Sequence, residues 1–255
     1  MTDFPATAGG IPVVVFETVG STNAEALERA RAGDIGPLWI IARRQTAGHG
    51  RRGRSWVSEP GNLYVSLLLS DPAPPSAIPG ICFVGALALH DALLDIAHGL
   101  APVQLKLKWP NDLLLGGAKI AGILVEGMSL GGGPAATVMG FGVNCKHHPA
   151  NVEFPATDLA AAGYAVDAET LLDALGAALA VRLKDWDRGE NFASIRAAWL
   201  ARATGIGEAI EVRLPNRTVA GVFETVDESG ALVLKHRDGT RETVAAGDVF
   251  PLAAG

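Results

Sequence analysis

The residues best suited to chemistry lie in one stretch, residues 43–56, which reads RRQTAGHGRRGRSW. Five of its fourteen residues are arginine and three are glycine. Glycine lets backbone N–H groups approach a ligand closely, and arginine presents a planar fork of donors that suits phosphate and carboxylate oxygens. We therefore predict a cationic loop that closes over an anionic ligand, an activated acid.

Two other interpretations of this stretch are a solvated surface loop and a dinucleotide-binding fingerprint. Arginine is mostly exposed in proteins, so composition alone leaves the surface loop open. Residues 48–53 spell G-x-G-x-x-G, but that fingerprint requires a helix that opens on the glycines. After the glycines the chain has Trp56, a turn-forming Glu-Pro-Gly at residues 59–61 and a strand-like segment at residues 63–69. We therefore reject the dinucleotide interpretation.

A second group of candidate residues lies beyond a strand-like segment at residues 103–108, in which apolar and polar residues alternate. Pro110 lacks a backbone N–H and disfavours helical geometry in the residue before it, so the strand is predicted to end there. Lys108, Asn111 and Asp112 then lie together at a strand end, where ligand sites are common. The alternative is an ordinary surface lysine, and its position directly before Trp-Pro favours a functional role.

Polar side chains at the start of a predicted helix form a third group. Ser21, Thr22 and Asn23 precede a helical pattern that includes Arg31 and stops at Gly33. These residue types are preferred helix caps, so capping alone would explain them. A helix N-terminus also has free N–H donors and a positive dipole, so a small polar or anionic group could dock there. Both interpretations stay open.

These three groups lack a covalent nucleophile. The sequence shows no defensible Ser-His-Asp order, no H-E-x-x-H and no Walker motif, and we interpret His147 and His148 as a solvated surface pair. The remaining groups suit a carboxylate that attacks a nucleotide α-phosphate. Two like charges 4 Å apart repel by about 4 kcal/mol at an effective dielectric constant of 20. We expect Lys108, with Arg51 and Arg54, to remove this repulsion and stabilise the transition state.

The elements that would position these groups are strands and helices in alternation. Strands are expected at residues 13–16, 38–42, 63–69, 103–108 and 137–144, with a hairpin at residues 113–126. Helices are expected at residues 21–31, 78–98 and 171–186, and around residues 195–200. Short strands are then expected at residues 210–214, 218–226, 231–235 and 240–244. We predict an α+β fold: a mixed β-sheet domain with packed helices at residues 1–206, then a small antiparallel barrel or sheet at residues 207–255.

Length and composition restrict the class of protein further. The chain has 255 residues, 49% hydrophobic and 19% charged, which is typical of a globular protein with ample core. Its formal net charge of -6 argues against general nucleic-acid binding. Residues 78–97 are apolar enough to suggest a membrane span, but a carboxylate such as Asp91 or Asp95 costs ~2.5–3.5 kcal/mol near a bilayer centre. Two cysteines and no secretory signal in residues 1–12 favour a cytoplasmic protein.

Several motifs occur in a fixed order along the first part of the chain. They are Ser21-Thr22-Asn23, QTAGHGRRGRSW at residues 45–56, Asn62-Leu63-Tyr64, KWPND at residues 108–112, KIAGILVE at residues 119–126 and GFGVN at residues 140–144. Together they resemble the biotin–protein ligase family over about residues 16–144. The C-terminal strands resemble the SH3-like domain of the same family, so the small barrel is expected to be SH3-like.

The resemblance implies a two-step reaction. Biotin and ATP, with Mg²⁺, would give biotinyl-5′-AMP and pyrophosphate, and the biotinyl group would then pass to a lysine of a biotin carboxyl carrier protein. The resemblance implies biotin binding by Ser21, Thr22, Asn23, Gln45, His49, Gly50, Arg51 and Lys108. It implies nucleotide binding by Arg51, Arg54, Trp56, Asn111 and Asn144, with the Trp56 ring as a lid over the adenine. Lys108 and Arg51 would be catalytic, and Lys108 would bridge the biotin carboxylate and the α-phosphate.

The chain departs from the family pattern at two points. The family loop usually has arginine where this chain has His49, so one positive charge depends on pH. Some fifteen residues precede Phe16, too few for the winged-helix DNA-binding domain that some members carry. We therefore expect the short type of ligase, an enzyme that binds neither DNA nor a membrane.

Two rival functions remain open. A lipoate– or octanoate–protein ligase shares the catalytic fold, and a biotin-binding regulator would hold the ligand without transferring it. The arginine–glycine loop and the KWPND motif favour biotin. The sequence leaves open the carrier protein, the Mg²⁺ ligands and whether the protein is a monomer or a homodimer.

Overall fold

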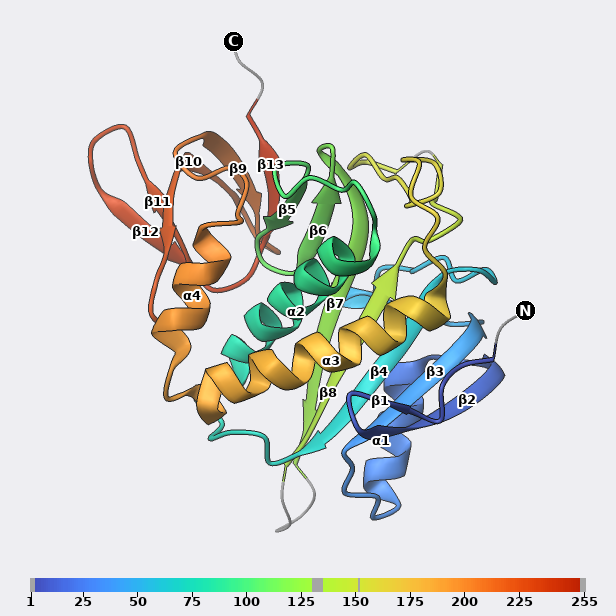
Figure 1. The fold of residues 1–255 in the computed structure, drawn as a ribbon. Helices are drawn as coiled ribbons and strands as arrows, with labels where there is room; N and C mark the ends of the chain where they lie inside the picture. Colours follow the sequence, from blue (N-terminus) through green and yellow to red (C-terminus); the bar gives the residue numbers. More distant parts are fainter. Residues whose placement is uncertain (1–2, 130–134, 151, 253–255) are drawn as a thin grey trace.

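The computed structural model describes residues 3–129, 135–150 and 152–252. It contains an eight-stranded mixed sheet in the order β1-β2-β3-β4-β8-β7-β6-β5 and a five-stranded antiparallel sheet in the order β12-β11-β10-β9-β13. Helices pack against the larger sheet, and the smaller sheet lies at the C-terminal end (Figure 1). The predicted α+β class, a mixed sheet followed by a small β domain, is confirmed.

The larger sheet contains one parallel pair of strands, near one of its edges. Its strands are β1 (Thr7–Ala8), β2 (Ile11–Val19), β3 (Leu38–Gln45), β4 (Leu63–Ser70), β5 (Leu105–Lys108), β6 (Asp112–Leu115), β7 (Ala118–Met128) and β8 (Ala136–Val143). Strands β2 and β3 are parallel, and the other neighbours are antiparallel. Parallel strands need a crossover connection, and helix α1 (Thr22–Arg31) supplies it. Because Val19 pairs with Gln45, the start of α1 and the end of β3 meet at one edge.

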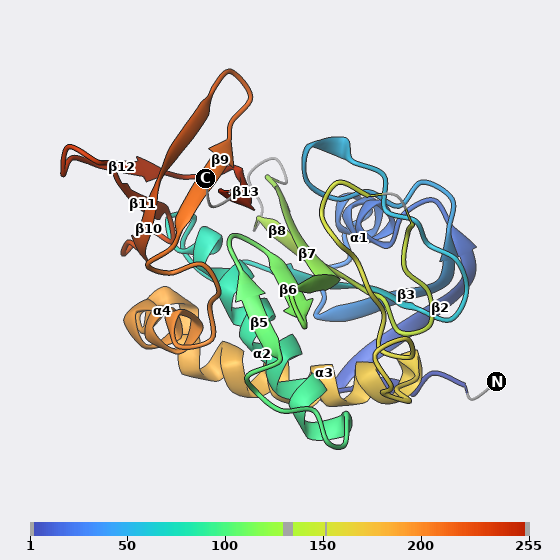
Figure 2. The same cartoon turned by 90° about the horizontal axis from the view of Figure 1, so that it is seen from above.

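The larger sheet is covered on both faces. Helix α1 lies on one side, and helices α2 (Ile81–Ile96) and α3 (Ala168–Trp186) lie on the other (Figure 2). Strand β3 is therefore buried on both faces. Trp39 and Ile41 belong to the larger hydrophobic core, whereas Leu38 and Ile40 belong to the core under α1. Burial on both faces explains why the strand reads as a continuous apolar run instead of alternating.

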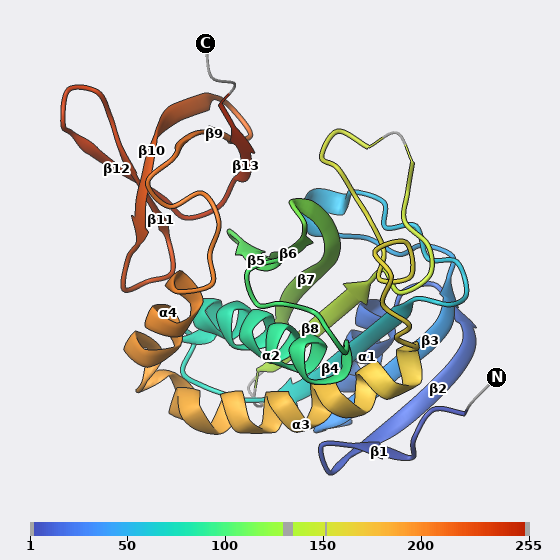
Figure 3. The ribbon, with the colours of Figure 1, turned by 45° about the horizontal axis from the view of Figure 1, so that its top comes forward.

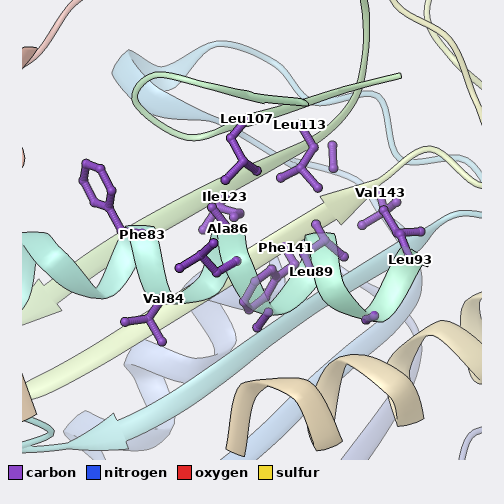
Figure 4. Packing of buried hydrophobic residues seen from close by; sticks show 14 of the residues in the cluster. Phe83, Val84, Ala86, Leu89, Leu93, Leu107, Leu113, Ile123, Phe141 and Val143 are labelled. Atoms are coloured by element: carbon purple, nitrogen blue, oxygen red, sulfur yellow. The ribbon is translucent and has the colours of Figure 1, made fainter. Parts of the chain in front are cut away.

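Helix α2 forms the centre of the larger core. Figure 4 shows its apolar side chains, among them Phe83, Leu89 and Leu93, packed over side chains of β7 and β8 such as Phe141. Full burial of each such side chain contributes about 1.5–3 kcal/mol. Among the described residues one helical segment, Ile78–Ile96, is long and apolar enough to cross a membrane, but 67% of its most apolar 18-residue stretch is buried inside the protein. It is a core helix, as predicted.

The C-terminal sheet packs beside the larger one. Its strands are β9 (Ala209–Arg213), β10 (Thr218–Val226), β11 (Leu232–Lys235), β12 (Arg241–Val244) and β13 (Asp248–Pro251). It lies next to β5 and β6 and close to helix α4 (Phe192–Leu200) (Figure 3). The indole Nε1 of Trp109 donates a hydrogen bond to the Gly230 carbonyl at 3.0 Å, and Phe223 shares the larger core. The boundary between residues 206 and 207 stays a prediction.

One predicted strand start was wrong, and two short strands were missed. Strand β5 begins at Leu105 rather than at residue 103, and Val103 is 73% exposed. Strands β1 and β13 were missed, because β1 has only two residues and the sequence of β13, Asp-Val-Phe-Pro, does not alternate between apolar and polar residues. Of these two strands, β13 contributes side chains to the cavity that holds the candidate residues.

Candidate active site

A cavity of about 380 Å³ opens where α1, residues 45–57, strands β6 to β8 and strand β13 meet. A small-molecule ligand commonly occupies a cavity of this kind. Every predicted site residue except Lys108 lines it, namely Ser21, Thr22, Asn23, Gln45, His49, Gly50, Arg51, Arg54, Trp56, Asn111 and Asn144. The structure therefore brings together residues from four separate stretches of the chain.

The start of α1 and the end of β3 form one polar end of the cavity. Ser21 is the N-cap of α1, and its Oγ accepts a hydrogen bond from the Ala24 N–H at 3.5 Å. The Thr22 N–H donates to Gln45 Oε1 at 2.8 Å, and Gln45 Nε2 donates to Ser58 Oγ at 3.0 Å. Ser21 therefore caps the helix, and Ser21 and Thr22 also line the cavity. Helix capping and ligand binding are thus compatible interpretations of these side chains. Donors and acceptors occur side by side here, as a cyclic urea would require.

Asn23 joins α1 to the sheet. Its Nδ2 donates to Glu126 Oε2 at 2.7 Å, and its Oδ1 accepts from Ser66 Oγ at 2.5 Å. Residue 140 is glycine because a Cβ there would collide with Asn23 Oδ1. Since both ends of the Asn23 amide already have partners, its evident role is to fix α1, and contact with a ligand stays a prediction.

The arginine–glycine loop is folded back on itself. The Gly50 N–H donates to the Arg54 carbonyl at 2.7 Å, and the Trp56 N–H donates to the Gly48 carbonyl at 2.9 Å. Between them lies a 3-10 turn, Arg51–Gly53, in which Arg52 has φ 57°. The backbone of the loop is therefore ordered, although residues 52–55 are exposed to solvent.

Within this loop Arg51 points inward. Its Nη1 donates to Asn111 Oδ1 at 3.4 Å and to the Gly247 carbonyl at 3.2 Å. Burial lowers the pKa of Arg51, and the nearby carboxylate of Asp248 opposes that shift. The residue that replaces the usual family arginine, His49, lies with its Nε2 3.7 Å from Glu126 Oε2.

Lys108 stands directly behind the cavity wall rather than in it. Its ammonium nitrogen lies 3.8 Å from Asp112 Oδ2 and 4.2 Å from the centre of the Phe154 ring, and its side chain is 12% exposed. Phe154 and Phe250 both line the cavity, and Phe250 is 5.9 Å from the same ammonium. Burial lowers the pKa of Lys108, and Asp112 counteracts part of that shift. The Phe154 ring thus covers one side of the Lys108 ammonium.

Trp56 covers the part of the cavity floor formed by two glycines. A Cβ at Gly142 would lie 2.6 Å from the Trp56 ring, and one at Gly122 would lie 3.3 Å from it. The ammonium of Lys119 is 5.3 Å from the centre of the indole ring. The indole Nε1 is buried and has no hydrogen-bond partner among the described residues. The structure thus shows why β7 and β8 carry glycines here, and the lid over adenine stays a prediction.

Sequence reasoning missed four residues that shape this cavity: Lys119, Asp248, Phe154 and Phe250. The ammonium nitrogen of Lys119 lies 2.6 Å from Asp112 Oδ1. The hairpin that brings these two charges together was predicted, so this pair could have been found. The other three residues come from segments far along the chain with no motif of their own, so no local signal pointed to them.

A mixed sheet with a polar cavity and a small C-terminal sheet can be compared with known protein families. Residues 15–144 match the "Biotin/lipoate A/B protein ligase family", and residues 205–250 match the "Biotin protein ligase C terminal domain". The chain belongs to the biotin/lipoate A/B protein ligase family.

Within this family the chain is similar to proteins named for biotin. It is 45% identical over 236 residues to a "Biotin--[acetyl-CoA-carboxylase] ligase" of Paracoccus denitrificans, covering 90% of this chain and 96% of the relative. It is 36% identical over 245 residues to the protein of that name in Mycobacterium tuberculosis, covering 94% and 88%. The biotin protein ligase of Aquifex aeolicus in complex with biotin and ATP shares the fold, with TM-score 0.77, 23% identity and coverage of 93% and 97%. The resemblance to biotin–protein ligases is confirmed.

Proposed function

We propose that the protein activates biotin with ATP as biotinyl-5′-AMP and transfers the biotinyl group to a lysine of a biotin carboxyl carrier protein. One observation carries the proposal: three cations converge on two consecutive residues at the start of β6. Arg51 hydrogen-bonds to Asn111, while Lys108 and Lys119 are paired with Asp112. Fixed positive charge beside a cavity that neutral donors and acceptors also line suits an acid that must meet a phosphate.

In the first step a biotin carboxylate oxygen attacks the α-phosphorus of ATP, and pyrophosphate leaves. Ser21, Thr22 and Gln45 would hold the ureido ring, so that the carboxylate points toward Arg51. Lys108 would then bridge the carboxylate and the α-phosphate, and we expect the Phe154 ring to move aside. In this position the ammonium offsets the repulsion between the two anions, about 4 kcal/mol at 4 Å and an effective dielectric constant of 20.

In the second step the amine of the carrier lysine attacks the acyl carbon of the anhydride, and AMP leaves. The nucleotide is assigned to Arg51, Arg54, Trp56, Asn111 and Asn144. The side-chain amides of Asn111 and Asn144 donate to the carbonyls of Ile123 and Thr157, at 2.7 and 3.1 Å. Both side chains are therefore held in place before the nucleotide binds.

ATP would bring Mg²⁺ with it. Among the described residues no group of three or more His, Cys, Asp or Glu side chains could hold a metal ion. We expect an ion held mainly by phosphate oxygens and water, as is usual for Mg²⁺ in nucleotide sites. The ion would neutralise phosphate charge; the protein residues would bind and orient the acid and the nucleotide.

The experiment that tests this function compares acids in ATP-dependent pyrophosphate release. We expect release with biotin and little with lipoate, and then biotinylation of an added carrier fragment but not of one lacking the acceptor lysine. A preference for lipoate would instead indicate a lipoate ligase. Pyrophosphate release without any carrier biotinylation would indicate a regulator that keeps the adenylate.

We also propose that the protein works in the cytoplasm. Both cysteines, Cys82 and Cys145, are free thiols, which is consistent with a reducing, cytoplasmic compartment. We expect the protein to bind neither DNA nor a membrane. The homodimer stays an open prediction that sedimentation equilibrium would test.

A further inference from the structure

We infer that Asp248 is a positioning residue: from the C-terminal sheet, its carboxylate holds the arginine loop over the cavity before any substrate binds. Asp248 Oδ2 accepts a hydrogen bond from Arg52 Nη1 at 3.0 Å and another from Arg54 Nη2. The carbonyl of the preceding residue, Gly247, accepts from Arg51 Nη1 at 3.2 Å. The three arginines of the turn are thus tied to two consecutive residues nearly two hundred positions further along the chain.

The C-terminal side of this contact is rigid. Strand β13 pairs with β9, with Asp248 opposite Arg213 and Val249 opposite Val212, and both valines are buried. A Cβ at Gly247 would collide with the Val212 side chain, so this position requires glycine. The carbonyl of the same glycine is the acceptor for Arg51. The Asp248 side chain is 15% exposed and lines the cavity. It is therefore a fixed acceptor rather than a mobile surface acid.

The loop side needs such a partner. Arg51, Arg52 and Arg54 lie within four residues, and their like charges repel one another. One carboxylate offsets part of that repulsion and leaves the loop with a net positive charge for an incoming phosphate. Pairs between fully exposed side chains contribute little, but here a single, mostly buried carboxylate accepts from two guanidiniums. Preorganisation of this kind strengthens binding because the loop is ordered before the ligand arrives.

The first experiment uses the unliganded protein and does not depend on its function. Trypsin cleaves after arginine, so the rate of cleavage within residues 51–54 reports how often the loop opens. We expect Asp248→Asn to speed this cleavage about tenfold, because cleavage follows the population of the open state. Asp248→Glu should restore most of the protection. Glu224→Gln is the matched control. It removes a carboxylate of the same sheet whose Oε2 lies 2.5 Å from Arg241 Nε and which has no contact with the loop arginines.

The second experiment rests on the proposed function. In biotin-dependent pyrophosphate release, Asp248→Asn should raise the KM for ATP about tenfold and keep kcat within about threefold, as expected when an ordered binding loop is lost and the reacting groups stay. A general loss of folding would lower kcat and the thermal midpoint together. Unchanged loop cleavage, or an ATP KM equal to or below that of the wild type, would overturn the inference. A wild-type protein that forms no biotinyl-AMP would refute the proposed function but leave the proteolysis result to decide the role of Asp248.

Discussion

At the residue scale the proposed reaction depends on two partly buried cations, Lys108 and Arg51. Lys108 is almost enclosed by Asp112 and the rings of Phe154 and Phe250. The sequence suggested Lys108 and Arg51 as candidates, because Lys-Trp-Pro at a strand end and glycine-spaced arginines are local patterns. It could not identify the aromatic rings or Asp248, because their contacts exist only after distant segments pack.

Replacing Lys108 tests its proposed role in bridging two anions. Lys108→Ala should lower the rate of biotinyl-AMP formation by on the order of a hundredfold or more, the usual effect of removing one charge-stabilising group. Single-turnover adenylation measures this directly. Lys106→Ala, two residues earlier on β5, is the control and should leave the rate near that of the wild type. A wild-type rate in Lys108→Ala would remove this residue from the mechanism.

The buried surroundings of Lys108 also predict a pH dependence. Because burial lowers the pKa of this lysine, its ammonium loses the proton at a lower pH than the ~10.4 of an ordinary lysine. The charged form is the active one, so adenylation should be fastest below that pKa and fall as pH rises through it. Lys108→Arg keeps its charge to higher pH, and its alkaline fall should shift upward or vanish. An identical alkaline limb in both proteins would assign it to another group.

At the element scale the parallel pair β2 and β3 positions the polar end of the cavity, because the crossover helix α1 starts where β3 ends. Alternation and capping residues predicted most strands and the helices α1 to α4. Strands β1 and β13 were missed, since β1 has two residues and β13, Asp-Val-Phe-Pro, does not alternate. The turn after β8 shows another limit: a single side chain, Asn62, which precedes the neighbouring strand β4, organises it.

Asn62 should be required for the turn at residues 145–147. Its Oδ1 accepts from the N–H groups of Cys145, Lys146 and His147, at 2.9, 2.9 and 3.1 Å. Asn62→Ala removes all three acceptor contacts, and each buried N–H left unsatisfied costs about 1–3 kcal/mol. We expect a loss of at least about 2 kcal/mol in the free energy of unfolding, measured with urea. Asn216→Ala, in an exposed turn, is the control.

A second measurement on the same variant uses the thiol of Cys145. Burial raises the pKa of this thiol to about 12, so it should resist thiol reagents at pH 8 in the wild-type protein. It should become reactive in Asn62→Ala if the turn opens. Unchanged stability together with an unreactive Cys145 would show that the turn holds without the Asn62 side chain.

At the scale of the whole molecule, the cavity belongs to both sheets. The C-terminal sheet supplies Asp248 and Phe250 to its wall, and the larger hydrophobic core continues through residues of both sheets, such as Leu107 and Phe223. The short, evenly spaced strands after residue 207 predicted the two-part architecture, but not that the second part contributes to the cavity. That contact depends on how the two sheets pack, which no stretch of sequence describes by itself.

The most direct test of the central claim is a structure of the protein with bound biotinyl-5′-AMP. We predict that the mixed anhydride lies between Lys108 and residues 49–54, with the Phe154 ring displaced and a phosphate or carbonyl oxygen about 3 Å from the Lys108 ammonium. An anhydride bound elsewhere in the fold, beyond the reach of both Lys108 and the loop arginines, would contradict this mechanism.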